Sequence, residues 1–403
     1  MSQELAWNGV HALVGPAPAD ARRADAARDL VRTAGIVVEH ASAERLAGLA
    51  DDWRDLTQRA DVANVFMHPA LLCEAIAAYP DRNISALLAW QDEPTRLVGI
   101  WAFSSGRALL SAPATPNAYL ATPVVDRDFL EPVLDGFLTF IAANASLPSI
   151  VALDTMDADT ATFAALTRVV ATRRGALHMF SRTQRPKLAS DLDAKAYFEQ
   201  AMSASSRKKL RQHRRRLGEK GALESSMVNE ADAVRRAFEN FLVLEASGWK
   251  GRQGTALLSD PADAAFTRGM IAALAAQGQA EIHSLALDGR PVSMQVLLRA
   301  GRTAFTWKTA YDEALHDFSP GTLLFEDYTA RLLADKDIDS VDSCSFDDSG
   351  YMASWRERKE VAHLWLDARA GGSITFHIRA RLQSAYLALR ARAKAVYHKH
   401  LRS

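Results

Sequence analysis

The stretch that decides the fold is residues 281–312, which read EIHSLALDGRPVSMQVLLRAGRTAFTWKTAYD. Asp288-Gly289 stands between two segments in which apolar and polar residues alternate, and this dipeptide favours a type I′ turn. Ala300-Gly301 is a second candidate for a two-residue turn in the same stretch. The pattern therefore predicts three consecutive antiparallel strands, at residues 281–287, 291–299 and 303–311.

The two tight turns also predict which side chains share a face of the sheet. They pair Leu287 with Arg290 and Arg299 with Arg302, and side chains alternate between the two faces from there. One face then carries polar residues, namely Ser284, Ser293, Gln295, Thr306 and Lys308. The other face is predicted to be core and carries His283, Met294, Val296, Phe305 and Trp307. Because buried polar groups without partners cost free energy, the polar face either meets water or lines a polar cleft.

Length and composition indicate a globular protein of more than one domain. The chain has 403 residues, of which 48% are hydrophobic and 24% charged, with a formal net charge of zero. This balance gives no whole-protein attraction to nucleic acid or membranes. Two distant cysteines, Cys73 and Cys344, are no disulfide framework and fit a reducing compartment. Residues 1–18 lack the pattern of a secretory signal, so we expect a cytoplasmic protein.

Helical and strand-like segments alternate along the rest of the chain, which predicts a mixed α/β fold. The strands flanking the central stretch are expected at residues 84–90, 97–103, 149–153 and 340–346. Helices are expected at residues 43–57, 68–78, 130–143, 160–172, 194–220, 231–247, 262–277, 322–333 and 375–401.

Four segments, in this order and spacing, resemble the CelD-type acetyltransferase domain of the GNAT superfamily. They are Glu245-Ala-Ser-Gly-Trp-Lys-Gly251, Asp288-Gly-Arg-Pro291, Trp307-Lys-Thr-Ala-Tyr-Asp312 and Ser319-Pro-Gly-Thr-Leu-Leu324. The resemblance covers about residues 195–365, and the basic segment 206–221 matches its start.

The family is similar to FemAB-type transferases, and the resemblance implies tandem GNAT-like acyl-CoA N-acyltransferase domains with mainly antiparallel sheets. We therefore expect a loose leader (1–35), an N-terminal GNAT-like domain (36–190), a C-terminal CelD-type domain with most of the active cleft (191–370) and a basic amphipathic helix (371–403).

The resemblance implies an acyltransferase with acyl-CoA, in the simplest case acetyl-CoA, as co-substrate. The expected acceptor is a small molecule or glycan precursor, with an amine or hydroxyl on a sugar, glycolipid or polysaccharide precursor. Residues 319–322 lack the Arg/Gln-x-x-Gly-x-Gly/Ala pattern of GNAT phosphate loops, so aminoacyl-tRNA stays open as the donor. A third reading is a catalytically degenerate GNAT pair that acts as a binding component of polysaccharide synthesis.

Three residues are candidates for catalysis. Glu245 ends an apolar helical stripe, and a desolvated carboxylate is a stronger base, although a structural pair with Lys250 or Lys308 is the alternative. Lys308 lies on the predicted polar face, where an ammonium can stabilise an oxyanion on the thioester carbonyl. Tyr351 follows the last core strand, where GNAT enzymes often carry a tyrosine that protonates the departing thiolate; packing in the core is its alternative.

The remaining candidates would bind substrates. Ser319, Gly321 and Thr322 form a strand-to-helix turn whose free N–H groups can hold a pyrophosphate, or simply cap a helix. The expected acceptor-binding residues are Trp249, Lys250, Gln295, Trp307, Tyr311 and Asp347. The eleven histidines show no metal-ligand spacing, so we expect no metal.

Two segments are strongly basic. Residues 205–220 hold eight Lys/Arg against one Glu, and residues 368–403 hold eight Lys/Arg and no acidic residue. The second segment also carries an apolar stripe of Ile378, Leu382, Tyr386 and Leu389. Each is typical of a solvated helix face, and the alternatives are an anionic donor, an RNA or, for the tail, an anionic membrane surface.

Overall fold

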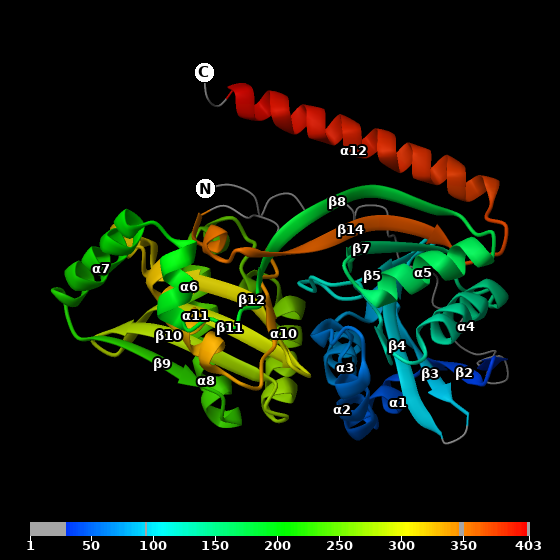
Figure 1. Cartoon of the computed structure of the whole chain (residues 1–403), viewed down its shortest axis with the longest axis horizontal. Coiled ribbons are helices and arrows are strands. Elements are labelled where there is room, and N and C mark those ends of the chain that lie inside the picture. The colour runs from blue at the N-terminus through cyan, green and yellow to red at the C-terminus, as the bar shows by residue number, and fades with distance from the viewer. Residues whose placement is uncertain (1–29, 93–94, 346–349, 401–403) are drawn as a thin grey trace.

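The chain forms one continuous sheet flanked by helices on both faces (Figure 1). The computed structural model describes residues 30–92, 95–345 and 350–400. The strands are β1 (Leu30–Thr33), β2 (Ile36–Ala41), β3 (Ile84–Gln91), β4 (Arg96–Ser105), β5 (Leu110–Ala112), β6 (Val124–Val125), β7 (Ile150–Asp157), β8 (Leu177–Leu188), β9 (Leu223–Val228), β10 (Ala280–Leu287), β11 (Arg290–Ala300), β12 (Thr303–Tyr311), β13 (Ser340–Asp342) and β14 (Glu357–Asp367). Their order is β1-β2-β3-β4-β5-β7-β14-β8-β13-β12-β11-β10-β9, with β6 beside β4. The predicted mixed α/β class is confirmed.

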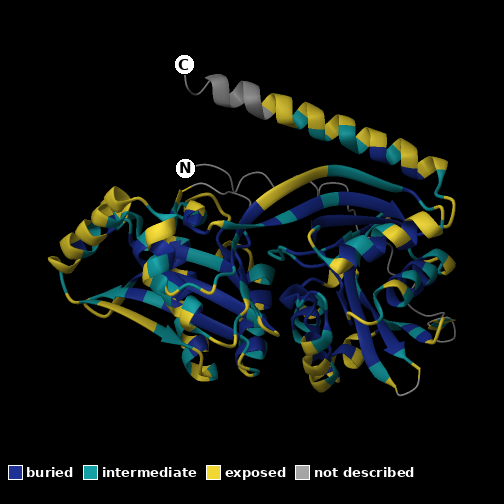
Figure 2. Ribbon diagram, viewed as in Figure 1, coloured by how far each residue is buried: buried dark blue, intermediate teal, exposed yellow. Residues whose placement is uncertain are grey.

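Helices cover each half of the sheet. The first half carries α1 (Ala43–Ala47), α2 (Ala50–Arg59), α3 (Pro69–Ala78), α4 (Leu130–Ala143) and α5 (Ala161–Thr172). The second carries α6 (Ala194–Ala201), α7 (Ala204–Gly218), α8 (Ala231–Ser247), α9 (Trp249–Arg252), α10 (Pro261–Ala275) and α11 (Pro320–Ala334), and α12 (Ile374–His400) follows. Short 3₁₀ turns include η7 (Glu313–Phe318) and η8 (Gly350–Ser354). Figure 2 shows the buried residues concentrated in the sheet and on the inner faces of its helices.

The two halves repeat one order of elements around the middle of the sheet. In each half a helix joins two parallel strands: α4 lies between β5 and β7, and α11 lies between β12 and β13. Each half then ends in a long strand that pairs across the middle. Strand β8 pairs with β13 of the second half, and β14 pairs with β7 of the first. The two halves are therefore interlocked rather than joined by a simple linker.

The central hairpin confirms the first turn and corrects the second. Asp288 and Gly289 have φ of 49° and 77°, and Leu287 pairs with Arg290 as the type I′ signal predicts. The second turn lies one residue later than expected, because Ala300 pairs with Thr303 and leaves Gly301-Arg302 as the turn.

Two β-bulges change which side chains share a face. In β12, Thr306 pairs with Leu297 but Lys308 pairs with Val296, so Trp307 is the extra residue. The side chain of Lys308 therefore lies on the same face of the sheet as that of Trp307. The expectation that it shares a face with Thr306 was wrong. A second irregularity, at Val292 of β11, pairs Ser284 with Met294 and so removes Ser284 from the predicted polar face.

Other differences concern segments with weak periodicity. The helix expected at 194–220 is two helices, because Ser203 breaks it and caps α7 by accepting a hydrogen bond from the Ser206 amide. Strands β8, β9 and β14 had not been expected. Of the predicted leader, residues 1–29 lie outside the described residues, and Leu30–Thr33 forms strand β1. Within the described ranges, no helix has the length and apolar character needed to cross a bilayer.

Candidate active site

The candidate site begins where β12 extends beyond its neighbour β13. The two strands pair in parallel only over Thr303–Phe305. At the bulge that follows, the side chains of Trp307 and Lys308 both contact Asn117 of the first half. The indole Nε1 of Trp307 donates to the Asn117 carbonyl over 2.8 Å, and Lys308 Nζ donates to its Oδ1 over 2.8 Å. Asn117 itself has a φ of 57°, a left-handed conformation that asparagine tolerates.

The segment that carries Asn117 is fixed by other residues of the first half. The fully buried amide of Asn64 donates to the carbonyls of Leu120 and Thr122, over 3.1 and 2.7 Å. Arg185 of β8 donates to the carbonyl of Tyr119 over 2.9 Å. The Tyr119 ring lies 5.9 Å from Lys308 Nζ. The first half thus supplies a rigid wall beside Lys308.

Gln295 supports the bulge from within the sheet. Its side chain is only 2% exposed, and its Nε2 donates to the carbonyls of Val296 and Lys308 over 3.0 Å each. The amide therefore fixes the backbone that presents Lys308. This contact makes Gln295 a positioning residue in the structure rather than an exposed contact for substrate.

Glu245 is buried, as its place on the apolar stripe predicts, and its partner is Lys250 rather than Lys308. The carboxylate is 3% exposed. Its Oε1 lies 3.2 Å from Lys250 Nζ, and its Oε2 accepts a 2.9 Å hydrogen bond from the Leu257 amide. Trp249 stands beside this pair, with Lys250 Nζ 5.9 Å from its ring. Both carboxylate oxygens hold the turn after α8.

This arrangement predicts the outcome of replacing Glu245. In Glu245→Gln the amide oxygen can still accept from Leu257, so we expect a folded protein in which acyl transfer, the activity that the resemblance implies, is nearly unchanged. Loss of a general base would instead cost ~10²–10⁴-fold in rate. Thiol release from acetyl-CoA and the melting temperature, measured together, separate the two outcomes. A large fall in rate at unchanged melting temperature would restore Glu245 as the base.

The expected phosphate site is the N-terminus of α11. Ser319 adopts φ 51° and ψ 52°, and Pro320 begins the helix, so the amide of Gly321 has no acceptor within the helix. A β-carbon on Gly321 would lie 3.7 Å from the ring of Tyr311, which is 38% exposed at the end of β12. Thr322 donates its amide to the Ser319 carbonyl over 3.0 Å. Tyr311 and this turn are therefore neighbours.

Two cations of α7 and the turn after it lie next to this helix N-terminus. The guanidinium of Arg216 is 5.3 Å, and the ammonium of Lys220 5.2 Å, from the ring centroid of Phe318, which directly precedes Ser319. Positive charge beside a helix N-terminus favours an anionic ligand there. Sequence reasoning had treated the basic segment as a whole and had not singled out these two residues.

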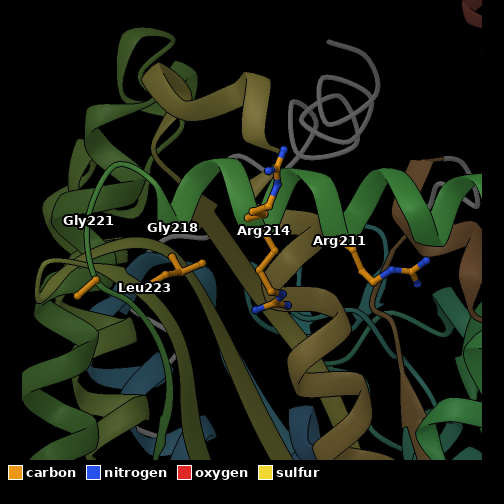
Figure 3. Close-up of a pocket in the computed structure, with 7 residues that line it drawn as sticks. Arg211, Arg214, Gly218, Gly221 and Leu223 are labelled. Carbon is orange, nitrogen blue, oxygen red and sulfur yellow. The ribbon is translucent and has the colours of Figure 1, made fainter.

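A second basic surface lies on α7 (Figure 3). It is an open depression of about 590 Å³ lined by Arg211, Arg214, Arg215, Gly218, Gly221, Ala222 and Leu223. Arg214 turns toward α11, where it bonds Asp327 over 2.6 Å and Glu326 over 3.2 Å. The side chain of Arg211 points along α7, away from Arg214 and Gly218. Part of the basic charge on α7 is thus neutralised by α11.

Tyr351 lies on the opposite side of the sheet from Trp307. It is partly buried in η8, with its ring 5.1 Å from that of Phe325 on α11. Trp307 instead packs in the core beneath α8, 6.4 Å from the ring of Phe238. Asp347 lies outside the described residues. No group of three or more potential metal ligands occurs among the residues that the structure describes.

A buried charge network that the sequence did not reveal crosses the middle of the sheet. Asp342 of β13 bonds Arg185 of β8 and, over 2.9 Å, Lys359 of β14. Lys359 also contacts Asp157 of β7 over 2.7 Å. Burial alone would raise the pKa of Asp342, but the charges of Arg185 and Lys359 outweigh burial and hold the pKa far below its usual range. The network joins four neighbouring strands next to the candidate site.

The sequence of the second half of the chain matches a known protein family. Residues 204–351 match the family described as acetyltransferase (GNAT) domain. No curated protein matches the sequence.

Solved structures share this fold over most of the chain. A crystal structure of FemX aligns with a TM-score of 0.55 at 11% identity, over 82% of this chain and 96% of that one. A C-terminal domain assigned to a lysylphosphatidylglycerol synthetase from Agrobacterium fabrum aligns with a TM-score of 0.50 at 15% identity, over 85% and 96%. The chain thus shares the fold of these two structures over most of its length, and residues 204–351 match the GNAT acetyltransferase domain.

Proposed function

We propose that the chain transfers an acyl group, in the simplest case acetyl, from acyl-CoA to an amine or hydroxyl of an acceptor. One observation carries this proposal, the arrangement of β12, α11 and β13 inside the matched GNAT domain. The parallel strands β12 and β13 pair over only three residues, and Arg216 and Lys220 lie beside the N-terminus of α11. That combination suits a nucleotide-bearing thioester, with phosphates at the helix and the acyl group between the strands.

The chemistry needs no covalent intermediate on the protein. The acceptor nitrogen or oxygen attacks the thioester carbonyl, an oxyanion forms, and the carbon–sulfur bond then breaks to release CoA thiolate. Lys308 would stabilise the oxyanion, and the proton that the acceptor nitrogen or oxygen loses would reach the thiolate through water. Tyr351, which the sequence had suggested as the proton donor, lies on the other side of the sheet from Lys308 and is not placed for this step. Positioning and charge stabilisation supply the acceleration. Gly321, Thr322 and Ser319 would hold the phosphates.

The acceptor would lie between the second half and the wall of the first. Trp249, Lys250, Tyr311 and Asp347 are its proposed contacts, whereas Trp307, expected at first to be one of them, is packed in the core. A sugar, glycolipid or polysaccharide precursor, as in CelD-type proteins, is the acceptor class that we propose, together with a cytoplasmic location. Screening acetyl-CoA thiol release against amino sugars and nucleotide sugars tests this finer assignment.

The phosphate site gives a direct prediction for Arg216 and Lys220. We expect Arg216→Glu with Lys220→Glu to weaken acetyl-CoA binding about tenfold or more, because each change places negative charge beside the phosphates. Acetyl-pantetheine, which lacks the nucleotide, should bind both proteins alike. Titration calorimetry with the two thioesters makes the comparison.

Arg82→Glu is a matched control, because Arg82 lies 5.2 Å from the ring of Tyr79 in the same kind of contact but in the first half. It should bind acetyl-CoA like wild type. Equal weakening in the control, or no binding of acetyl-CoA by the wild type, would contradict the proposed site.

A Fem-like transferase that uses aminoacyl-tRNA is the second candidate. The Arg-lined depression on α7 and the structural similarity to FemX favour it. Binding of bulk tRNA that falls steeply with salt, together with no binding of acetyl-CoA, would establish this candidate over the first.

A further inference from the structure

Helix α12 is attached to the body of the protein along one narrow stripe. Phe376 and Ala380 are 1% and 2% exposed and join a small core cluster with Trp365 of β14. One turn further on, Ser384 Oγ lies 2.9 Å from His178 Nε2 of β8. In Figure 1 the helix runs along the outside of β8 and β14. These contacts fix which side of the helix faces the protein.

The opposite side of α12 is apolar and faces outward. Five of the nine exposed large hydrophobic side chains among the described residues lie on this helix: Ile374 (80%), Ile378 (54%), Leu382 (66%), Tyr386 (45%) and Leu389 (68%). Ile378 and Leu382 each lie two positions beyond a docked residue, which is about 200° around a helix. In Figure 2 much of the ribbon of α12 has the colour of exposed residues. The stripe therefore cannot contact the sheet while the docked side stays in place.

The edges of this apolar stripe are basic. At about 100° per residue, Arg379 lies on one side of the stripe, and Arg381 and Arg392 lie on the other. Residues 368–403 contain eight Lys/Arg and no Asp or Glu. An outward apolar stripe between two basic edges is the arrangement of helices that lie in the interface of an anionic membrane.

We propose that α12 docks the protein on an anionic lipid surface, with the stripe inserted among the lipids and the arginines on the headgroups. The charge pattern selects this partner over a second copy of the chain, because two such helices would bring only like charges together. The helix lies on the bilayer and does not cross it, since it remains bonded to β8 and β14. This inference does not depend on the proposed acyl transfer.

The test uses the full chain and lipid vesicles in a sedimentation assay. We expect binding to vesicles that contain phosphatidylglycerol, and much weaker binding to pure phosphatidylcholine. Leu382→Asp should lower the partition coefficient about tenfold or more, because a charge replaces an inserted apolar side chain. Arg379→Gln with Arg381→Gln should lower it about fivefold per charge removed, and added salt should reduce wild-type binding.

Val243→Asp is the matched control, because Val243 is 65% exposed on α8, far from α12 along the chain, and Leu382 is 66% exposed. The control should bind vesicles like wild type, and all variants should keep the wild-type melting temperature. Three results would overturn the proposal: no vesicle binding by the wild type, equal loss in Val243→Asp, or a wild-type dimer without vesicle binding that Leu382→Asp converts to a monomer.

Discussion

Asp342→Asn is expected to lower the free energy of unfolding by about 3–5 kcal/mol, because it leaves a buried guanidinium without its counter-ion. Arg185 is 1% exposed and Asp342 is 2% exposed, so water cannot replace the lost carboxylate. Lys359 keeps Asp157 as a partner. Because the four residues join β7, β14, β8 and β13, the loss should weaken the contact between the two halves. Chemical denaturation, monitored by tryptophan fluorescence, measures the change in the free energy of unfolding.

The same carboxylate predicts how stability depends on pH. Its folded pKa lies below its unfolded value of about 4. The carboxylate therefore contributes its full stability above pH ~4, and this contribution is lost as the pH falls toward the folded pKa. The difference in stability between wild type and Asp342→Asn should be constant from pH 6 to pH 8 and shrink below pH ~4.

Asp337→Asn provides the control for both measurements. Asp337 is 92% exposed and lies 4.0 Å from Arg302, so its removal should change stability by less than about 1 kcal/mol. If Asp342→Asn were no more harmful than Asp337→Asn, the central network would contribute no more than a surface pair.

Local signals in the sequence predicted much of the second half. The Asp288-Gly289 turn and alternating strands fixed the hairpin, and strong amphipathic periodicity gave α8 at its observed bounds, Ala231–Ser247. The burial of Glu245 followed from its place on the stripe of that helix. Such features depend on neighbours within a few residues, which the sequence displays directly.

Non-local features could not be predicted in the same way. The exchange of β8 and β14 between the halves depends on pairing across more than a hundred residues. Strand β8 also carries many polar residues, and only three of its twelve residues are buried. A bulge of one residue at Trp307 moved Lys308 to the other face, since strand register alternates with a period of two. Nothing in the sequence singled out Asn117 as a contact of Lys308. It reads only as a turn-forming residue in a segment that contains three prolines, Pro113, Pro116 and Pro123.

The largest functional effect is expected from Lys308→Met. The bulge and the Gln295 amide present Lys308 beside β12, and Asn117 Oδ1 orients its ammonium at 2.8 Å. Methionine keeps most of the side-chain volume and removes the charge. Asn117 still accepts from Trp307 through its carbonyl, so the melting temperature should stay close to that of wild type.

If Lys308 stabilises the oxyanion, its loss should reduce turnover by ~10²–10³-fold. Release of CoA thiol reports turnover, with the acceptor found in the screen or with water. Lys308→Arg keeps the charge and should recover part of the rate, whereas Asn117→Ala should cost less than Lys308→Met because the ammonium remains. Lys195→Met, on the exposed surface of α6, should leave turnover unchanged. Wild-type turnover in Lys308→Met, combined with a much lower melting temperature, would show that Lys308 only joins the two halves.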